Sequence, residues 1–157
     1  MDAISFIALA AACAPLVDLG TAQAIVMVER SFNPNAIGIV AGALDRQPRT
    51  PAEALATARA LQASGWNFSV GLAQINVHNF ARLRLSMADA FDDCRNLQAM
   101  QTLLGECRAR VSPKIAAQTA LRRTLSCYYS GNFTTGFRHG YVNRVVNVAR
   151  RSARAPP

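Results

Sequence analysis

The sequence has few of the residues on which many enzyme sites depend. Its 157 residues include two histidines, far apart, and four cysteines without CxxC spacing, and it has no glycine-rich phosphate-binding loop. These absences argue against a zinc site, a histidine-based triad and a phosphate-binding site. We therefore predict neither a metal nor a cofactor. Glutamate is also scarce, since only Glu29, Glu53 and Glu106 occur.

Long apolar runs are missing as well. The longest spans residues 3–17, contains Ser5 and Pro15, and is shorter than the roughly 18–20 residues that a membrane-spanning helix needs. It follows Asp2, whereas a secretory signal peptide begins with basic residues. We expect a core helix here rather than a cleaved signal, and we do not expect an integral membrane protein.

Acidic residues are absent from the last third of the chain. Residues 1–106 carry seven bases and nine acids, whereas residues 107–157 carry ten bases and no acid, which gives a net charge of +8. Such a basic region suits a polyanion, which could be nucleic acid, a membrane surface or a cell-wall polymer. It also suits an ordinary solvated surface, so charge alone does not identify a partner.

The patterning predicts an α+β fold, mostly α, in one domain over residues 1–150 with a frayed tail at 151–157. Capping residues mark two helix starts, Asp18 for a helix to Arg30 and Thr50 for a helix that ends before Gly65. We expect further helices near 95–110, 114–128 and 140–151, a β-hairpin from 37–40 and 43–45, and an irregular or extended segment at 67–76.

Glu29 differs from the other two glutamates. It follows Ile25 and Val26 by four and three residues, so it lies on the same helix face as these apolar side chains. Burial of a carboxyl group on such a face raises its pKa, as a general acid near neutral pH requires. The alternative is a carboxylate at the helix end that points to solvent or pairs with Arg30.

Three segments then resemble one known family. Val28–Ile37 is similar to the E-S-x-F-x-P-x-A-I segment of the soluble lytic transglycosylase domain, Gly71–Asn76 to its GLMQIN segment, and Cys127–Asn132 to its Y-N-x-G-N segment. They occur in the family's order. Ala90–Asn96 and Gly136–Val142 are similar to further segments of the branch that opens peptidoglycan for type IV secretion systems.

The resemblance implies a lysozyme-like helical domain with a small β-hairpin element. It also implies cleavage of the β-1,4 bond between N-acetylmuramic acid and N-acetylglucosamine without water, with Glu29 as acid and then base. Substrate-binding residues carried over from the motifs are Gln74, Asn76, Tyr128, Ser31, Gly71 and Asn132. Tyr128 would hydrogen-bond Glu29, or simply be a buried core aromatic; Gln74 and Asn76 would bind sugar substituents, or cap a loop.

Three positions depart from the family pattern. Arg30 stands where the family has Ser, Ala73 where it has Met, and Tyr129 where it has Asn. These departures keep open a non-catalytic peptidoglycan-binding assembly subunit. A hydrolytic muramidase would need a second carboxylate, for which Asp45 is the best-placed candidate. A nucleic-acid-binding protein is the remaining alternative, but no motif supports it.

Four cysteines allow three disulfide pairings. Cys94 and Cys107 lie thirteen residues apart in one expected helix, about 20 Å, which is too far for a disulfide. If helices 95–110 and 114–128 form an antiparallel hairpin, Cys94 pairs with Cys127 and Cys13 with Cys107. Four free, buried thiols are the alternative. Disulfides and a peptidoglycan substrate would both indicate the periplasm.

Overall fold

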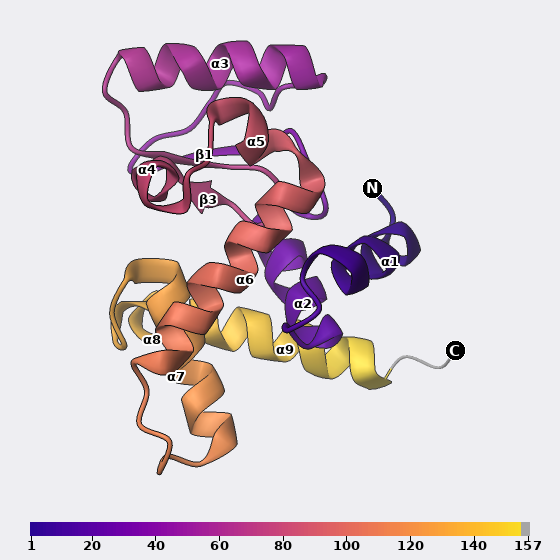
Figure 1. The fold of residues 1–157 in the computed structure, drawn as a ribbon, viewed down its shortest axis with the longest axis vertical. Coiled ribbons are helices and arrows are strands. Elements are labelled where there is room, and N and C mark those ends of the chain that lie inside the picture. The colour runs from indigo at the N-terminus through magenta and orange to yellow at the C-terminus, as the bar shows by residue number, and fades with distance from the viewer. Residues whose placement is uncertain (155–157) are drawn as a thin grey trace.

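The structure, a computed structural model, describes residues 1–154. Helices make up most of it and one small sheet lies on one side, which confirms the α+β, mostly α, lysozyme-like fold class (Figure 1). Its elements are α1 (Ala3–Cys13), α2 (Leu19–Arg30), β1 (Ile37–Ile39), α3 (Pro51–Ala63), β2 (Phe68–Val70), β3 (Ile75–Asn76), a 3₁₀ turn η1 (Val77–Asn79), α4 (Phe80–Leu83), α5 (Met87–Phe91), α6 (Asp93–Ala109), α7 (Ala117–Ser130), α8 (Thr135–Arg138) and α9 (Tyr141–Arg154).

Side-chain caps begin the helices where the sequence predicts them. The Asp18 carboxylate accepts from the Thr21 N–H at 2.8 Å, and the Thr50 hydroxyl accepts from the Glu53 N–H at 3.2 Å. The apolar run near the N-terminus forms α1 and buries Phe6, as expected for a core helix. No helix within residues 1–154 is long and apolar enough to span a membrane.

The sheet differs from the predicted hairpin. Residues 43–45 form no strand; β1 instead pairs antiparallel with β2, which places Ile37 opposite Val70, and β2 pairs antiparallel with β3. The Gln47 carboxamide takes the place of the expected second strand. It accepts from the Ile37 N–H at 2.8 Å and donates to the Ile37 carbonyl at 2.9 Å. One side chain thus satisfies a strand edge that we expected backbone to pair.

The elements form two lobes (Figure 1). The sheet lobe, residues 37–91, holds β1–β3 and α3–α5, and the helical lobe holds α1, α2 and α6–α9. Helix α6 starts beside the sheet lobe and runs down to α7, while α2 packs along α9. This arrangement places the C-terminal ends of α2 and α7 at the cleft that is described below.

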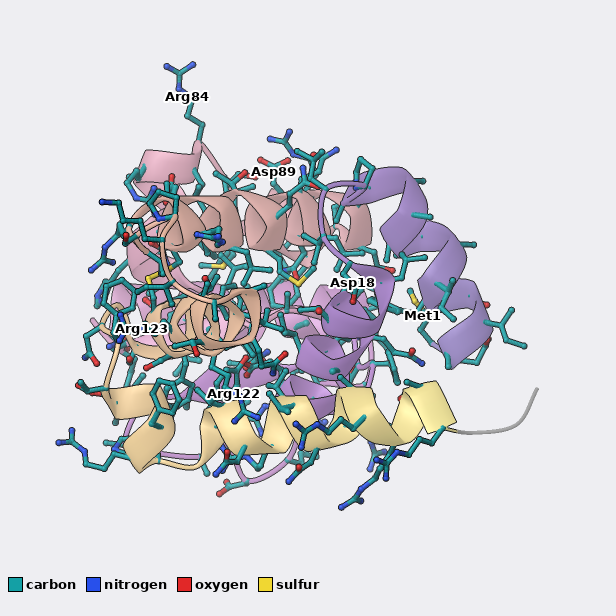
Figure 2. The ribbon with its side chains drawn as sticks, turned by 90° about the horizontal axis from the view of Figure 1, so that it is seen from below. Met1, Asp18, Arg84, Asp89, Arg122 and Arg123 are labelled. Carbon is teal, nitrogen blue, oxygen red and sulfur yellow. A yellow bond between two sulfur atoms is a disulfide. The ribbon has the colours of Figure 1, made fainter. Side chains whose placement is uncertain are left out.

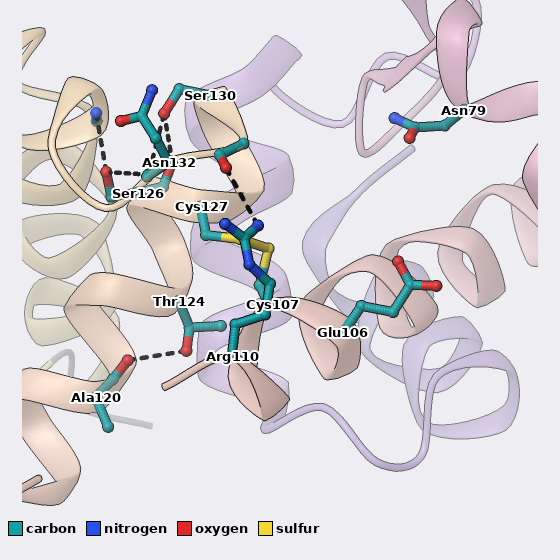
Figure 3. Close-up of a disulfide and its surroundings, with 12 residues drawn as sticks. Asn79, Glu106, Cys107, Arg110, Ala120, Thr124, Ser126, Cys127, Ser130 and Asn132 are labelled. Atoms are coloured by element: carbon teal, nitrogen blue, oxygen red, sulfur yellow. Dashed lines mark hydrogen bonds between the residues drawn. A yellow bond between two sulfur atoms is a disulfide. The ribbon is translucent and has the colours of Figure 1, made fainter. Parts of the chain in front are cut away.

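The disulfide prediction is wrong. The pairs are Cys13–Cys94, which joins α1 to the start of α6, and Cys107–Cys127, which joins α6 to α7 (Figure 3). The exclusion of Cys94–Cys107 holds because α6 is one continuous helix. Helices α6 and α7 do pack against each other, but residues 110–116 carry the chain beyond α6 before α7 turns back, so their register differs from the one assumed (Figure 1). The C-terminal half of α7, and not its start, therefore meets Cys107.

Helix α9 continues into the segment expected to be a frayed tail. It is helical as far as Arg154, and residues 155–157 lie outside the described part of the chain. Tyr141, Val142, Val145 and Val146 form its buried face, as their helical spacing predicts. This buried face carries one residue of the site.

Candidate active site

A cleft of about 780 Å³ opens between the two lobes. The helical lobe lines it with residues from the ends of α2 and α7 and from the turn after α8, and the sheet lobe lines it with β1, the β2–β3 region and η1. The polar or aromatic lining residues are Glu29, Arg30, Asn67, Ser69, Gln74, Asn76, Asn79, Tyr128, Tyr129, Ser130 and His139. Many are neutral amides and hydroxyls, which suits a sugar better than an apolar ligand.

Glu29 lies in the last turn of α2, where the helix ends in an unusual backbone conformation. Ser31 and Phe32 both have left-handed φ angles, 51° and 62°, which non-glycine residues rarely adopt. The Phe32 ring is buried and packs against Phe6 with ring centroids 5.2 Å apart. That packing holds the turn, and the turn leaves Glu29 on the cleft wall.

The surroundings of Glu29 raise its pKa to about 7 from 4.5. Desolvation by burial is the main cause, and the Tyr141 hydroxyl and the charges of Arg30 and Arg144 partly oppose it. A carboxyl group with this pKa holds a proton near neutral pH and can also release it. The direction of this pKa shift is the one that the apolar helix face of Glu29 predicts.

Tyr141 is a site residue that the sequence reasoning missed. Its side chain is 1% exposed, and its hydroxyl lies close enough to Glu29 to favour the carboxylate, although it makes no hydrogen bond of standard geometry within residues 1–154. The sequence shows Tyr141 only as one apolar member of a helix face. The tyrosine itself could have been the signal. A buried tyrosine hydroxyl normally has a hydrogen-bond partner, so a tyrosine on a buried helix face indicates a polar group nearby.

Of the two interpretations of Tyr128, the structure agrees with the packed aromatic whose hydroxyl has its own partner. Its hydroxyl donates to the Ala73 carbonyl at 2.6 Å rather than to Glu29. This bond ties the end of α7 to the turn between β2 and β3.

Tyr129, the next residue, connects two other side chains. Its ring stacks on Tyr141 with centroids 4.5 Å apart, and the Tyr129 hydroxyl lies 3.1 Å from Nδ1 of His139. His139 therefore lines the cleft, although its position in the sequence suggested no role.

Gln74 and Asn76 both line the cleft, and both also hold the loop around them. The Gln74 amide nitrogen donates to the carbonyls of Ala36 and Gly71, at 3.1 and 3.0 Å. The Asn76 amide nitrogen donates to Asn67 Oδ1 at 2.8 Å, and its oxygen accepts from the His78 N–H. The two readings of these residues, sugar contact and loop support, are therefore compatible.

Three of the predicted substrate-binding residues lie outside the set that lines the cleft: Ser31, Gly71 and Asn132. Ser31 forms the left-handed end of α2. Gly71 has a φ of 79°, and a Cβ there would collide with the buried Asn96 carboxamide and with the Ala90 carbonyl. The Asn132 side chain accepts from the backbone N–H groups of residues 134 and 135. Each shapes a neighbouring segment.

A smaller hollow of about 330 Å³ adjoins the cleft on the far side of Tyr128. The Cys107–Cys127 disulfide lines it, beside Arg110, whose guanidinium donates to the Gly131 carbonyl at 3.1 Å (Figure 3). Tyr128 and Gly131 line both hollows. The adjoining hollows suit a chain-like ligand better than a single small molecule.

Three further residues do not line the cleft. Asp45, the candidate second carboxylate, is exposed; Phe68 is fully buried in the core; and Trp66 is half-exposed. Within residues 1–154, no cluster of three or more His, Cys, Asp or Glu side chains could hold a metal ion. Among the described residues that line the cleft, Glu29 is the one carboxylate.

Comparison with known proteins gives one family. The sequence model of the transglycosylase SLT domain matches residues 6–144. The type IV secretion system protein virB1 of Brucella abortus is 47% identical over 153 residues, which cover 93% of this chain and 64% of that protein. Proteins named virB1 from Rhizobium radiobacter and Agrobacterium fabrum are 38% and 34% identical, covering 88% of this chain and 58% and 57% of theirs.

The chain thus spans less than two thirds of the length of the curated relatives it matches. No solved structure matches it significantly.

Proposed function

Since the chain belongs to the transglycosylase SLT domain family, we propose that it is a lytic transglycosylase that cuts the glycan strands of peptidoglycan. The bond cleaved is the β-1,4 link from N-acetylmuramic acid to N-acetylglucosamine, and the product ends in a 1,6-anhydromuramoyl ring. One observation carries the proposal: among the described residues, Glu29 is the only carboxylate that lines the cleft, and burial raises its pKa to about 7.

A single carboxyl group is sufficient for this reaction. Protonated Glu29 donates its proton to the glycosidic oxygen, and the bond to C1 of the muramoyl residue breaks with an oxocarbenium-like transition state. The Glu29 carboxylate then takes the proton from the muramoyl C6 hydroxyl as that oxygen bonds to C1. The proton count balances without water, whereas most glycosidases place two carboxylates around the bond.

The neighbours of Glu29 support both halves of this cycle. Burial favours the acid form that starts the reaction, while the Tyr141 hydroxyl and the charges of Arg30 and Arg144 favour the carboxylate that completes it. Tyr128 acts one step away, because its bond to the Ala73 carbonyl fixes the turn that carries Gln74. Gln74, Asn76 and Asn67 then present amide groups that suit the acetamido and hydroxyl substituents of the sugars.

Two alternatives have weaker support. A hydrolytic muramidase needs a positioned second carboxylate, and Asp45 is exposed and outside the cleft lining. A non-catalytic peptidoglycan-binding subunit would explain Arg30, Ala73 and Tyr129. Of these, Ala73 is buried and keeps its backbone bonds to Asn96 and Tyr128, so the turn is intact without methionine.

The relatives named as type IV secretion system proteins support a local opening of the cell wall for such an apparatus, with other subunits of that system as partners. The two disulfides support a periplasmic location, since disulfides form and persist in oxidising compartments. Nothing in the site favours a nucleic-acid ligand over a glycan strand.

Mass spectrometry of the products tests the function directly. Purified peptidoglycan is incubated with the protein, with Glu29→Gln, and with Asp45→Asn as a matched carboxylate control. We expect anhydromuropeptides from the wild type and from Asp45→Asn, and none from Glu29→Gln. Reducing-end products that require Glu29 would favour the hydrolase, and binding without turnover in all three proteins would favour the assembly subunit.

A further inference from the structure

Arg30 is the one arginine or lysine among the described residues that line the cleft. Its guanidinium takes part in neither of the two ion pairs within residues 1–154, Arg46–Glu53 and Arg82–Glu106. It also makes no side-chain hydrogen bond within those residues, and it is solvent-exposed. An arginine with five unused N–H donors therefore faces the cleft beside the acid.

The Arg30 guanidinium lies over Gly38. A Cβ at residue 38 would lie 2.7 Å from Arg30 Nη2 and 2.5 Å from Gln74 Oε1. The guanidinium and the amide oxygen thus both lie over the α-carbon of Gly38, where the Cβ of any other residue would collide with each. The absence of a side chain at this position in β1 creates the place that they share.

The Gln74 carboxamide has only its oxygen free at this point. Its nitrogen donates to the carbonyls of Ala36 and Gly71, and its backbone is held at a left-handed φ of 51°. The shared place therefore offers an amide acceptor next to a guanidinium donor. A ligand that fits both carries an N–H group and, beside it, a carboxylate.

A muramoyl ring has these two groups on adjacent carbons. Its acetamido group at C2 supplies an N–H, and the lactyl ether at C3 ends in a carboxylate when no peptide is attached. Arginine binds carboxylates with two parallel N–H···O bonds, whereas serine, which the family has at this position, offers one hydroxyl.

Resting on the proposed function, we propose that Arg30 and Gln74 form a carboxylate-reading subsite, with Arg30 the residue that makes the enzyme select muramoyl residues whose lactyl carboxylate is free. Such a substrate arises by hydrolysis of the lactyl amide, which adds water and releases the peptide amine. A carboxylate of an attached stem peptide is the other possible source of the same chemistry, and the experiment separates the two.

The test measures binding by titration calorimetry in the Glu29→Gln protein. This substitution removes turnover and any effect of Arg30 on the pKa of Glu29. The probes are a peptide-free N-acetylglucosaminyl-N-acetylmuramic acid tetrasaccharide, the same tetrasaccharide with stem peptides, and chitotetraose, which has no carboxylate. The variants are Arg30→Gln, Arg30→Lys and the control Arg84→Gln. Figure 2 shows the Arg84 side chain extending away from the molecule, so this control removes one charge outside the cleft.

We expect Arg30→Gln to weaken binding of the peptide-free tetrasaccharide by about 10- to 100-fold, because hydrogen bonds to a charged group are lost. Arg30→Lys should lose part of this affinity, and Arg84→Gln none. Chitotetraose should bind all variants equally. An Arg30 effect confined to the peptide-bearing probe would assign the carboxylate to the stem peptide and overturn the lactyl assignment.

Equal weakening of chitotetraose, or no Arg30 effect on any probe, would overturn the subsite. In those cases anhydro products from the wild type would still support the proposed function, so the two proposals fail separately. Failure of all three probes to bind the Glu29→Gln protein would overturn the subsite, whereas the proposed function fails only if the wild type yields no anhydro products.

Discussion

The two lobes are held together by different means. Both disulfides lie in the helical lobe, where they join α6 to α1 and to α7. The sheet lobe has no cysteine and relies on side-chain amides bonded to backbone or to each other, such as Gln47 on the edge of β1 and Asn76 with Asn67. The covalently linked lobe carries Glu29, the proposed proton donor, and the hydrogen-bonded lobe carries the polar groups opposite it.

The two lobes differ in the way that the two halves of the site require. Glu29 needs a fixed, partly desolvated place, and linked helices with buried apolar faces provide one. The groups that would contact the sugars need polar side chains at short strands and turns, where backbone N–H and carbonyl groups also need partners. Asn96 connects the two, because it lies on α6 and bonds to backbone of the sheet lobe.

Removal of the disulfides should give the largest effect on stability. Cys13–Cys94 closes a loop of 81 residues and Cys107–Cys127 a loop of 20. Loop-closure entropy predicts losses of about 4.5 and about 3.3 kcal/mol in unfolding free energy for the paired Cys→Ala variants. Denaturant unfolding of each double variant under oxidising conditions measures this. A larger loss for Cys107–Cys127 would show that local packing, and not loop length, decides.

Asn96→Ala should weaken the link between the lobes. The Asn96 amide donates to Val70 and Ala90 carbonyls at 3.0 and 2.8 Å, and its oxygen accepts from the Ala73 N–H at 2.8 Å. Loss of these buried bonds should cost about 3 kcal/mol, because each stranded partner adds a desolvation penalty. Thermal unfolding measures it.

The control for this change is Gln98→Ala, an exposed position on the same helix, which should stay within about 0.5 kcal/mol of the wild type. If Asn96→Ala is equally mild, water has replaced the carboxamide and the link between the lobes is weaker than its geometry indicates.

The raised pKa of Glu29 should make stability depend on pH. A folded-state pKa of about 7 against 4.5 means that the folded protein holds this proton more tightly than the unfolded chain. The resulting stability is complete below pH 4.5 and is lost as the pH rises through 7, with a total of up to about 3 kcal/mol. Glu29→Gln should therefore gain stability relative to the wild type between these pH values.

Unfolding free energies of both proteins at pH 4.5, 6 and 8 measure this difference. Glu53→Gln is a useful control, since the Arg46 side chain and the Arg49 N–H lower the pKa of Glu53 and no loss in this pH range is expected. A constant difference between wild type and Glu29→Gln across the range would contradict the burial of the acid.

The smallest expected loss of stability comes from removing one helix cap in each lobe. Asp18→Ala removes the acceptor for Thr21 N–H at the start of α2, and Thr50→Ala removes the one for Glu53 N–H at the start of α3. Each should cost about 1 kcal/mol by equilibrium unfolding. Because α2 carries Glu29, only Asp18→Ala should also lower the cleavage rate; an equal loss of rate in both variants would mean that the lobes are coupled more tightly.

The helical half of the fold was predictable because its signals are local. Caps at Asp18 and Thr50, Gly65 after α3 and the apolar spacing of α9 all lie within a few residues of the structure that they specify. The hairpin failed since strand partners are chosen over long separations, here Ile37 with Val70. The disulfides failed for the same reason, because they depend on how far residues 110–116 carry the chain before α7 begins.

The residues of the site also differ in whether local sequence or long-range packing places them. The sequence by itself singled out Glu29, because an acid three and four residues after apolar side chains shares their helix face, and it predicted the direction of the pKa shift while leaving a solvent-facing carboxylate open. Only the tertiary structure decided which tyrosine faces that acid. Tyr128 turns to the Ala73 carbonyl, and Tyr141 comes from α9, 112 residues away in the chain. Helix packing sets that contact, and no local pattern encodes it.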